Sequence, residues 1–189
     1  MKTPENVRKR KLEHLFNILD FNKNGLLQPD DFIHVAEKMS DILGFDKDNK
    51  DRLQLKFKAT RIYIQLLTDM GKMDVSIDKD EWLGFFNSDL QLDSNAAKRY
   101  IFRTAAYIFM LFDQNGDKVI SKQEFVDMFT VYQIKLDQSK SAFDKLDTNH
   151  DGQISMEEMI KGFEDYFLSP DPDAAGNWIF GDWRSENAA

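Results

Sequence analysis

The sequence predicts an all-α fold of four helix–loop–helix units arranged in two pairs. Two twelve-residue segments, 113–124 and 147–158, repeat one spacing of Asp, Asn, Ser and Glu, and a third copy lies at 20–31. A fourth segment, 70–81, keeps only part of the pattern. Asp and Asn also form ordinary turns, but three copies at one spacing are hard to explain that way. In chain order we call these segments loops one (20–31), two (70–81), three (113–124) and four (147–158).

Apolar residues at helical spacing lie on both sides of every loop. The expected helices cover about 5–19, 49–68, 79–90, 95–112, 122–134, 137–146 and 155–168. A further helix follows loop one, where Pro29 suits the first turn. The apolar stripes of the first four helices are Leu12, Leu15, Phe16 and Leu19; Phe32, Ile33, Ala36 and Met39; Leu53, Phe57, Ile64 and Leu67; and Trp82, Leu83, Phe85 and Phe86.

These elements predict an N-terminal pair of units at 1–90, a C-terminal pair at 95–168 and a tail at 169–189. Only a few residues, Gln91 to Asn95, separate the pairs. The next segment, 96–112, is apolar around much of its circumference, and such a helix is expected to be buried. We therefore expect two halves packed on each other, with the tail packed on the body.

The loop spacing has a chemical meaning, because calcium is a hard cation that takes six to eight oxygen ligands. In a twelve-residue calcium loop these come from side chains at positions 1, 3, 5, 9 and 12 and from the carbonyl at position 7. Loop four is complete, with Gly152 at the sixth position. Its predicted ligands are Asp147, Asn149, Asp151, the carbonyl of Gln153, Ser155 and Glu158.

Loop three has the same donors but lacks the glycine at position 6. Lys118 stands there, in a backbone conformation that costs residues other than glycine roughly 1–2 kcal/mol. Three carboxylates can offset this cost, so we expect binding with somewhat reduced affinity. The predicted ligands are Asp113, Asn115, Asp117, the carbonyl of Val119, Ser121 and Glu124.

Loop one has the weakest set of the three, because Asp31 replaces the usual bidentate Glu and only two of its ligands carry charge. Magnesium prefers smaller, octahedral sites and could occupy this loop in particular. The predicted ligands are Asp20, Asn22, Asn24, the carbonyl of Leu26, Gln28 and Asp31.

Loop two keeps Glu81 at position 12 but has Met70 and Lys72 where oxygen ligands are needed, so we expect no calcium there. The residues at position 8 of paired loops can meet in a short antiparallel contact. This predicts Leu27 against Ile77 and Ile120 against Ile154, so that an empty loop can still support its partner. The expected total is three Ca²⁺ ions, with Mg²⁺ possible at the same loops.

Composition narrows the function classes. The chain has 189 residues, no cysteine and a formal net charge of −8, so disulfides and cysteine zinc sites are excluded and nucleic acid is a poor partner. The start of the chain lacks a secretory apolar run, which favours a cytoplasmic location. The most apolar stretch, 100–112, is too short to span a bilayer. Phosphate-loop and metalloprotease motifs are absent, so an enzyme is not expected.

The basic run Arg8-Lys9-Arg10-Lys11 is the one segment of opposite sign. A solvated face of the first helix is the expected role, with contact to anionic lipid or a partner as the alternative. Three bound calcium ions would add six positive charges to the formal −8, leaving −2. Metal is therefore expected to make the protein more compact.

Taken together, the chain resembles the sarcoplasmic calcium-binding proteins, a family of compact four-unit EF-hand proteins that includes the calexcitins and is related to the coelenterazine-binding proteins. The resemblance covers nearly the whole length. It depends on the loop starts at 20, 70, 113 and 147, the defective second loop, Gly116 at position 4 of loop three, and the tail from Leu168 to Trp183. It implies a cytosolic Ca²⁺/Mg²⁺ buffer without enzymatic activity, in which loops one, three and four bind metal. We expect the protein to be a monomer.

Two other functions stay open. In a calcium sensor, the tail aromatics Trp178, Ile179, Phe180 and Trp183 would be a detachable plug over a partner site, whereas in a buffer they would close the core. Core packing is the expected role of Met110, Met128, Met156 and Met159. A luciferin-binding protein would need polar groups in an apolar cavity, for which His14, His34, Trp82, Tyr107 and Tyr132 are suitable types.

Overall fold

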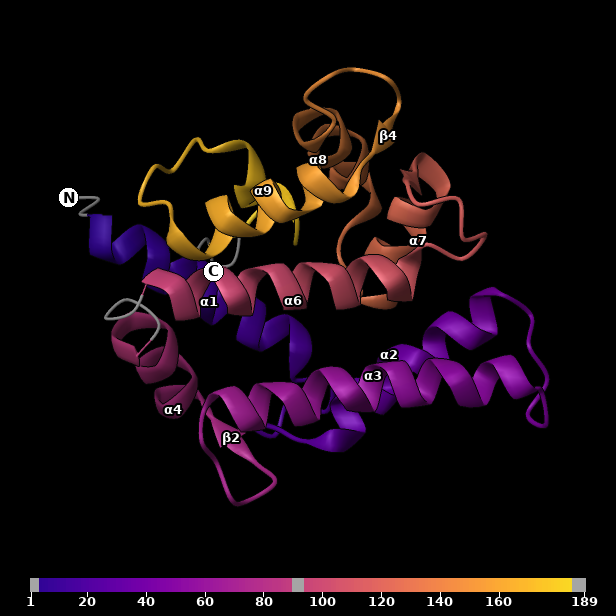
Figure 1. The fold of residues 1–189 in the computed structure, drawn as a ribbon, viewed down its shortest axis with the longest axis horizontal. Coiled ribbons are helices and arrows are strands. Elements are labelled where there is room, and N and C mark those ends of the chain that lie inside the picture. The colour runs from indigo at the N-terminus through magenta and orange to yellow at the C-terminus, as the bar shows by residue number, and fades with distance from the viewer. Residues whose placement is uncertain (1–3, 90–93, 185–189) are drawn as a thin grey trace.

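The computed structural model describes residues 4–89 and 94–184. It consists of helices, with two short antiparallel sheets formed between the loops (Figure 1). Helices flank each loop as expected: α1 (Pro4–Leu19) and α2 (Pro29–Ile42), α3 (Lys50–Asp69) and α4 (Lys79–Gly84), α6 (Ser94–Phe112) and α7 (Lys122–Val131), α8 (Ser139–Leu146) and α9 (Met156–Leu168). Shorter turns are a π-helix, η1 (Phe85–Asp89), and 3₁₀ turns η2 (Leu136–Gln138) and η3 (Ala175–Trp178).

The loops pair through two-residue strands in the predicted register. Strand β1 (Leu26–Leu27) runs antiparallel to β2 (Ile77–Asp78), and Leu27 lies opposite Ile77. Strand β3 (Ile120–Ser121) pairs in the same way with β4 (Gln153–Ile154), with Ile120 opposite Ile154. All four position-8 side chains are fully buried, so the prediction from loop position is confirmed.

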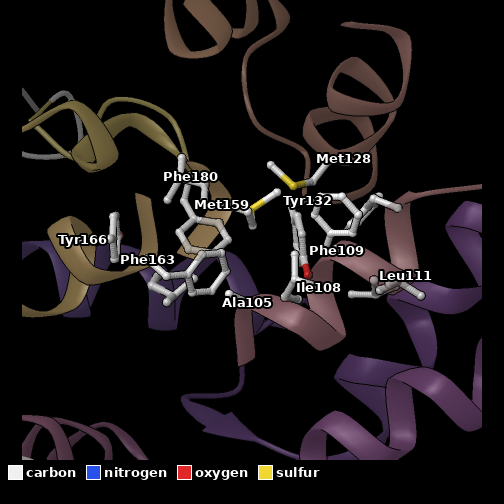
Figure 2. Close-up of a cluster of buried hydrophobic side chains, with 14 of the residues drawn as sticks. Ala105, Ile108, Phe109, Leu111, Met128, Tyr132, Met159, Phe163, Tyr166 and Phe180 are labelled. Atoms are coloured by element: carbon white, nitrogen blue, oxygen red, sulfur yellow. The ribbon is translucent and has the colours of Figure 1, made fainter. Parts of the chain in front are cut away.

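Side chains from both pairs of units form one continuous aromatic core. Phe86 at the end of the N-terminal pair stacks on Phe167 of α9 with ring centres 5.0 Å apart, and Tyr100 of α6 packs edge-on against both. Figure 2 shows the C-terminal part of this core, where α6 faces Met128 and Tyr132 on one side and side chains of α9 and the tail on the other. The expectation of two halves packed on each other is confirmed.

The tail folds back onto α9 and α1. Ile179, Phe180 and Trp183 are buried, and the ring of Phe180 packs against Tyr166 at 5.1 Å between centres. The approach is close at Gly176, where an added Cβ would lie 2.1 Å from the carbonyl oxygen of a residue in α9. Glycine is therefore required at this contact.

The basic run of α1 fixes the tail instead of forming a solvated face, so that prediction was wrong. Lys11 is fully buried, and its ammonium donates to the carbonyl oxygens of Asp165 and Ser169, both at 2.9 Å, and to Oδ1 of Asn177 at 2.7 Å. The Arg8 side chain donates to the carbonyl oxygens of Phe86 and Phe167. Arg10 lies over the ring of Trp183, at 5.1 Å, and Lys9 is the member of the run that is exposed.

Two of the predicted apolar faces also need correction. The core side of α3 consists of Leu55, Ala59, Tyr63 and Leu66, so Leu53, Phe57 and Ile64 point to solvent. On α6, eight of the described residues are buried, but Phe102 and Met110 are exposed, so Met110 does not have the core position that was predicted for it. Met128 and Met159 have the predicted core positions, and Met156 is partly buried against the core.

The helix expected at 79–90 is shorter than predicted, because α4 ends at Gly84 and η1 continues to Asp89. The predicted linker, 91–95, lies largely outside the described residues, as do the ends of the chain at 1–3 and 185–189. Among the helices that are described, none combines the length and the apolarity that crossing a bilayer requires.

Candidate metal centres

Loop four folds around its own acidic and amide side chains. The carboxylate of Asp147 accepts the N–H groups of Asp151 and Gly152, at 3.1 and 2.9 Å. Oδ1 of Asn149 accepts the N–H of Asp151 at 2.9 Å, and Oδ1 of Asp151 accepts the N–H of Gln153 at 2.9 Å. These bonds hold the side chains at positions 1, 3 and 5 against the same turn of backbone.

Loops one and three repeat this arrangement. In loop three the first donor to the position-1 carboxylate is residue 4 of the loop instead of residue 5. The donor and acceptor pairs are, in loop one, Asn24 and Gly25 to Asp20, Asn24 to Asn22 and Leu26 to Asn24, and, in loop three, Gly116 and Lys118 to Asp113, Asp117 to Asn115 and Val119 to Asp117.

The carboxylate at position 12 joins the two ends of each of these loops. Glu158 accepts the N–H of Thr148 at 2.9 Å through one oxygen and the N–H of Ser155 at 2.9 Å through the other. The same pair of bonds runs from Gln114 and Ser121 to Glu124, and from Phe21 and Gln28 to Asp31. An ionised carboxylate has about four acceptor positions. Glu158 also accepts the Thr148 and Ser155 hydroxyls and the N–H of Asn149, so a cation in loop four would replace some of these donors.

Backbone conformation is also shared. Positions 4 and 6 of loops one, three and four have φ in the left-handed region, and in each loop one of the two is glycine. In loop three the glycine is at position 4, so Lys118 adopts φ +70° at position 6, as the sequence predicted. A residue with a Cβ costs roughly 1–2 kcal/mol in this conformation.

Loop two follows a different path, because its first residues close the preceding helix. Gly71, with φ +64°, donates its N–H to the carbonyl of Thr68 at 3.1 Å, and Lys72 donates its N–H to the carbonyl of Leu67 at 2.9 Å. This is the Schellman pattern of a helix C-terminus. Position 1, held by Met70, is therefore the cap residue of α3.

The charge of loop two is also arranged differently. Glu81 keeps its bond from the N–H of Asp78, at 2.9 Å, but its other oxygen contacts the ammonium of Lys72. The same ammonium lies 3.2 Å from the carboxylate of Asp74. A lysine thus supplies, within the chain, the positive charge that the carboxylates of a calcium loop would take from an ion.

The donor sets of loops one, three and four contain oxygen only, which fits a hard cation. Loops three and four each offer three carboxylates and loop one offers two. Burial raises the pKa of Asp31, with the nearby charge of Asp20 acting in the same direction and N–H donors opposing it. Burial acts likewise on Glu158, but the backbone and hydroxyl donors of Ser155 and Thr148 together hold its pKa below the usual value.

Because the loop carboxylates face backbone amides, no three His, Cys, Asp or Glu side chains converge on one point among residues 4–89 and 94–184. The remaining predicted ligands of each loop are amide, hydroxyl and backbone carbonyl oxygens of the same twelve residues. The sequence patterns S-x-x-E at 121–124 and 155–158 indicate capping boxes, and the structure has them. Sequence reasoning had used these residues only as ligands.

A small apolar cavity of about 50 Å³ lies at the centre of the molecule. Its lining includes Trp82, Tyr107 and Tyr132, three of the five residues considered for a luciferin site, together with Phe180 of the tail. His14 instead donates from Nε2 to the carbonyl oxygen of Phe180 at 2.8 Å, and His34 packs on the ring of Phe21.

The sequence of this chain is similar to sequences of known proteins. Residues 102–164 match the family model of the EF-hand domain pair. The probable calcium-binding protein CML44 of Arabidopsis thaliana is 30% identical over 78% of this chain and 88% of its own. The chain belongs to the EF-hand family.

The fold of this EF-hand protein is shared by two functional classes. The calcium-loaded apo form of the coelenterazine-binding protein of Renilla muelleri superposes with a TM-score of 0.82, covering 96% of this chain and 99% of that one, at 19% identity. A sarcoplasmic calcium-binding protein from amphioxus gives a TM-score of 0.69, covering 94% and 97%, at 16% identity. The fold expected from the resemblance is confirmed, and it is common to both classes.

Proposed function

We propose that this EF-hand protein binds calcium in loops one, three and four, leaves loop two empty, and acts as a Ca²⁺/Mg²⁺ buffer. The predicted ligands of the three loops would hold the ion, whose charge would be balanced by two or three carboxylates in each. Residues 1–90 and 95–168 would then be two metal-binding units, the first with one ion and the second with two.

The observation that carries the proposal is the contrast in position 12. In loops one, three and four this carboxylate joins both ends of a loop whose donors are all oxygen, and in loop two it contacts the ammonium of Lys72. An ion entering loop two would have to displace that ammonium from Glu81 and Asp74 and open the helix end at Gly71. Both changes oppose binding there.

A buffer is favoured over a sensor by the way the tail closes the core. A sensor opens on calcium binding and exposes an apolar groove, whereas a buffer hardly opens. Here Ile179, Phe180 and Trp183 are buried, and the Lys11 ammonium holds the tail through three oxygen atoms. Opening would have to break this buried contact.

Binding of an apolar dye tests this choice. The fluorescence of such a dye would be compared in chelator, in calcium and in magnesium, with calmodulin as the positive control for opening. The buffer proposal expects little calcium-specific increase. A large increase that calcium causes and magnesium does not would assign the protein to the sensors.

Luciferin binding is the second candidate, favoured by Tyr107, Tyr132 and Trp82 around the central cavity. The cavity of about 50 Å³ is small compared with pockets for drug-sized ligands, which have volumes of roughly 300–1,000 Å³. Mixing the protein with coelenterazine and recording absorbance tests this function. A saturable spectral change at micromolar protein would support it, and an unchanged spectrum would exclude it.

A further inference from the structure

Helices α3 and α6 form a face on which most of the exposed side chains are apolar or basic. The two helices are in contact and run antiparallel across the molecule (Figure 1). The contacts that join them along their length are the Arg103–Asp69 ion pair, the Arg61 guanidinium 5.3 Å from the ring centre of Tyr107, and a 2.9 Å hydrogen bond from the Lys58 ammonium to the carbonyl of Met110. We call the exposed surface of Leu53, Phe57, Lys58, Arg61, Ile64, Lys98, Phe102 and Met110 the α3–α6 face.

The apolar side chains of this face are large, and the core does not use them. Leu53, Phe57 and Ile64 are 53%, 62% and 57% exposed. At 100° per residue they fall within an arc of about 40° on α3, so they form one stripe. Phe102 and Met110 of α6 add exposed fractions of 57% and 48%. Single exposed apolar residues are common, but a contiguous set on two neighbouring helices indicates a contact surface.

The charge of these helices is opposite to that of the rest of the chain. Together α3 and α6 contain eight of the 25 Lys and Arg residues but only two of the 33 Asp and Glu residues. Arg52, Lys56 and Arg103 are paired with carboxylates. Lys58, Arg61 and Lys98 are exposed beside the apolar residues of the face. A strongly acidic protein thus presents one basic and apolar surface.

The shape of the face decides between kinds of partner. An amphipathic helix docks in a groove, but the exposed apolar residues Leu53, Phe57, Phe102 and Met110 do not line the central cavity or the two surface pockets beside Thr68 and Asn17. Side chains that project from two adjacent helices, outside these three pockets, fit a flat, deformable surface. Apolar side chains flanked by Lys and Arg are the pattern of helices that lie in the interface of an anionic bilayer.

We propose that the α3–α6 face docks on anionic lipid bilayers. Phe57, Ile64 and Phe102 would enter the boundary between headgroups and acyl chains, and Lys58, Arg61 and Lys98 would lie among the lipid phosphates and carboxylates. Each Lys or Arg near such a surface contributes about 1 kcal/mol. This docking uses no residue of the metal loops and is independent of the proposed buffer function.

Co-sedimentation with vesicles tests the proposal, using the full chain in calcium and in chelator. Vesicles of phosphatidylserine and phosphatidylcholine would be compared with vesicles of phosphatidylcholine alone. Lys58→Glu/Arg61→Glu is expected to weaken binding to the anionic vesicles by roughly tenfold or more. Lys135→Glu/Lys140→Glu makes the same change in net charge away from this face, so it is the matched control and should bind much more strongly than Lys58→Glu/Arg61→Glu.

A second variant, Phe57→Ser/Ile64→Ser, keeps the charge and removes two apolar contacts. It is expected to bind anionic vesicles several-fold more weakly, and circular dichroism of each variant shows whether it is folded. Failure of the unaltered protein to sediment with anionic vesicles in either calcium or chelator would overturn the proposal. Equal weakening by the control variant would also overturn it, because net charge alone would then explain binding. Retention on an immobilised acidic peptide without vesicle binding would assign the face to a protein partner instead.

Discussion

Loops two and four are both twelve residues long, both end in glutamate and both pair through a buried isoleucine. Their carboxylates nevertheless have different partners. In loop four, the carboxylates of Asp147 and Glu158 accept backbone N–H groups of the loop. In loop two, Lys72 contacts Glu81, and Gly71 closes α3. The strand contact does not depend on a complete set of loop ligands, because Ile77 pairs with Leu27 although Met70 and Lys72 replace two oxygen donors of loop two.

Substitution of the position-12 glutamate in loops two, three and four gives the largest expected difference. Glu158→Gln removes a charged, bidentate ligand, so the calcium stoichiometry should fall from about three to two. Glu124→Gln should have the same effect on loop three. The matched control is Glu81→Gln, which should leave the stoichiometry unchanged. Loss of an ion in that control, measured by calorimetry, would show that loop two binds metal.

Lys72 of loop two and Lys11, which contacts the tail, are both surrounded by oxygen atoms, but their pKa values shift in opposite directions. Lys72 lies among carboxylates. Burial acts to lower its pKa, but contact with Glu81 and Asp74 outweighs burial and raises the pKa. Lys11 lies mainly among neutral carbonyls, so burial, with the charge of Arg8, lowers its pKa to about 7. Lys72 thus forms ion pairs with carboxylates, whereas Lys11 forms hydrogen bonds with neutral oxygen atoms.

Lys11→Met is expected to lower the free energy of unfolding by roughly 2–4 kcal/mol at pH 9, because buried acceptors lose their donor. The folded-state pKa of about 7 lies below the ordinary 10.5. Between these values the folded chain binds fewer protons than the unfolded chain, so the contribution of Lys11 to stability rises with pH. It is lost as pH falls toward 7.

Urea unfolding of both proteins in chelator, from pH 6.5 to 9.5, measures this contribution. The difference between the unaltered protein and Lys11→Met should grow with pH. Lys9→Met is the control, since Lys9 is exposed on the same helix, and it should change stability little at any pH. A difference for Lys11→Met that is independent of pH would contradict the shifted pKa.

Lys118→Gly should make loop three more like loop four. Relief of the left-handed conformation is expected to add about 1 kcal/mol, which would appear as a roughly fivefold gain in calcium affinity or as added stability of the apo protein. The control is Lys161→Gly, which lies inside α9 and outside the loops, where glycine should destabilise instead. Unchanged affinity and stability in Lys118→Gly would mean that its conformation costs nothing.

The smallest effect is expected from Met70→Asp/Lys72→Asn, which gives loop two oxygen donors at positions 1 and 3. The backbone still closes α3 at Gly71 and lacks the left-handed residues at positions 4 and 6. We therefore expect no additional calcium site by calorimetry. A fourth ion would show that side chains alone, and not the path of the backbone, keep loop two empty.

Much of the fold could be predicted because loop spacing fixes geometry locally. The pairing of Ile120 with Ile154 and the conformation of Lys118 follow from position within a twelve-residue loop, and the structure confirms both. The contact between Lys72 and Glu81 was not predicted, because counting missing ligands does not show what replaces the ion.

Long-range contacts of charged side chains could not be read from the sequence. Lys11 reaches oxygen atoms more than 150 residues away, and nothing in its local pattern distinguishes it from exposed Lys9. The apolar stripe of α3 was assigned to the wrong side, since helical spacing identifies residues that share a face but not what covers that face. Leu53, Phe57 and Ile64 therefore looked like core residues.

Calorimetric titration of calcium into chelator-stripped protein, with and without millimolar magnesium, tests the central claim most directly. We expect three tight sites whose apparent affinity falls strongly under magnesium, because the two ions would exchange at the same loops. Four sites would contradict the assignment of loop two. Weaker, micromolar sites that magnesium leaves unchanged would contradict the buffer function.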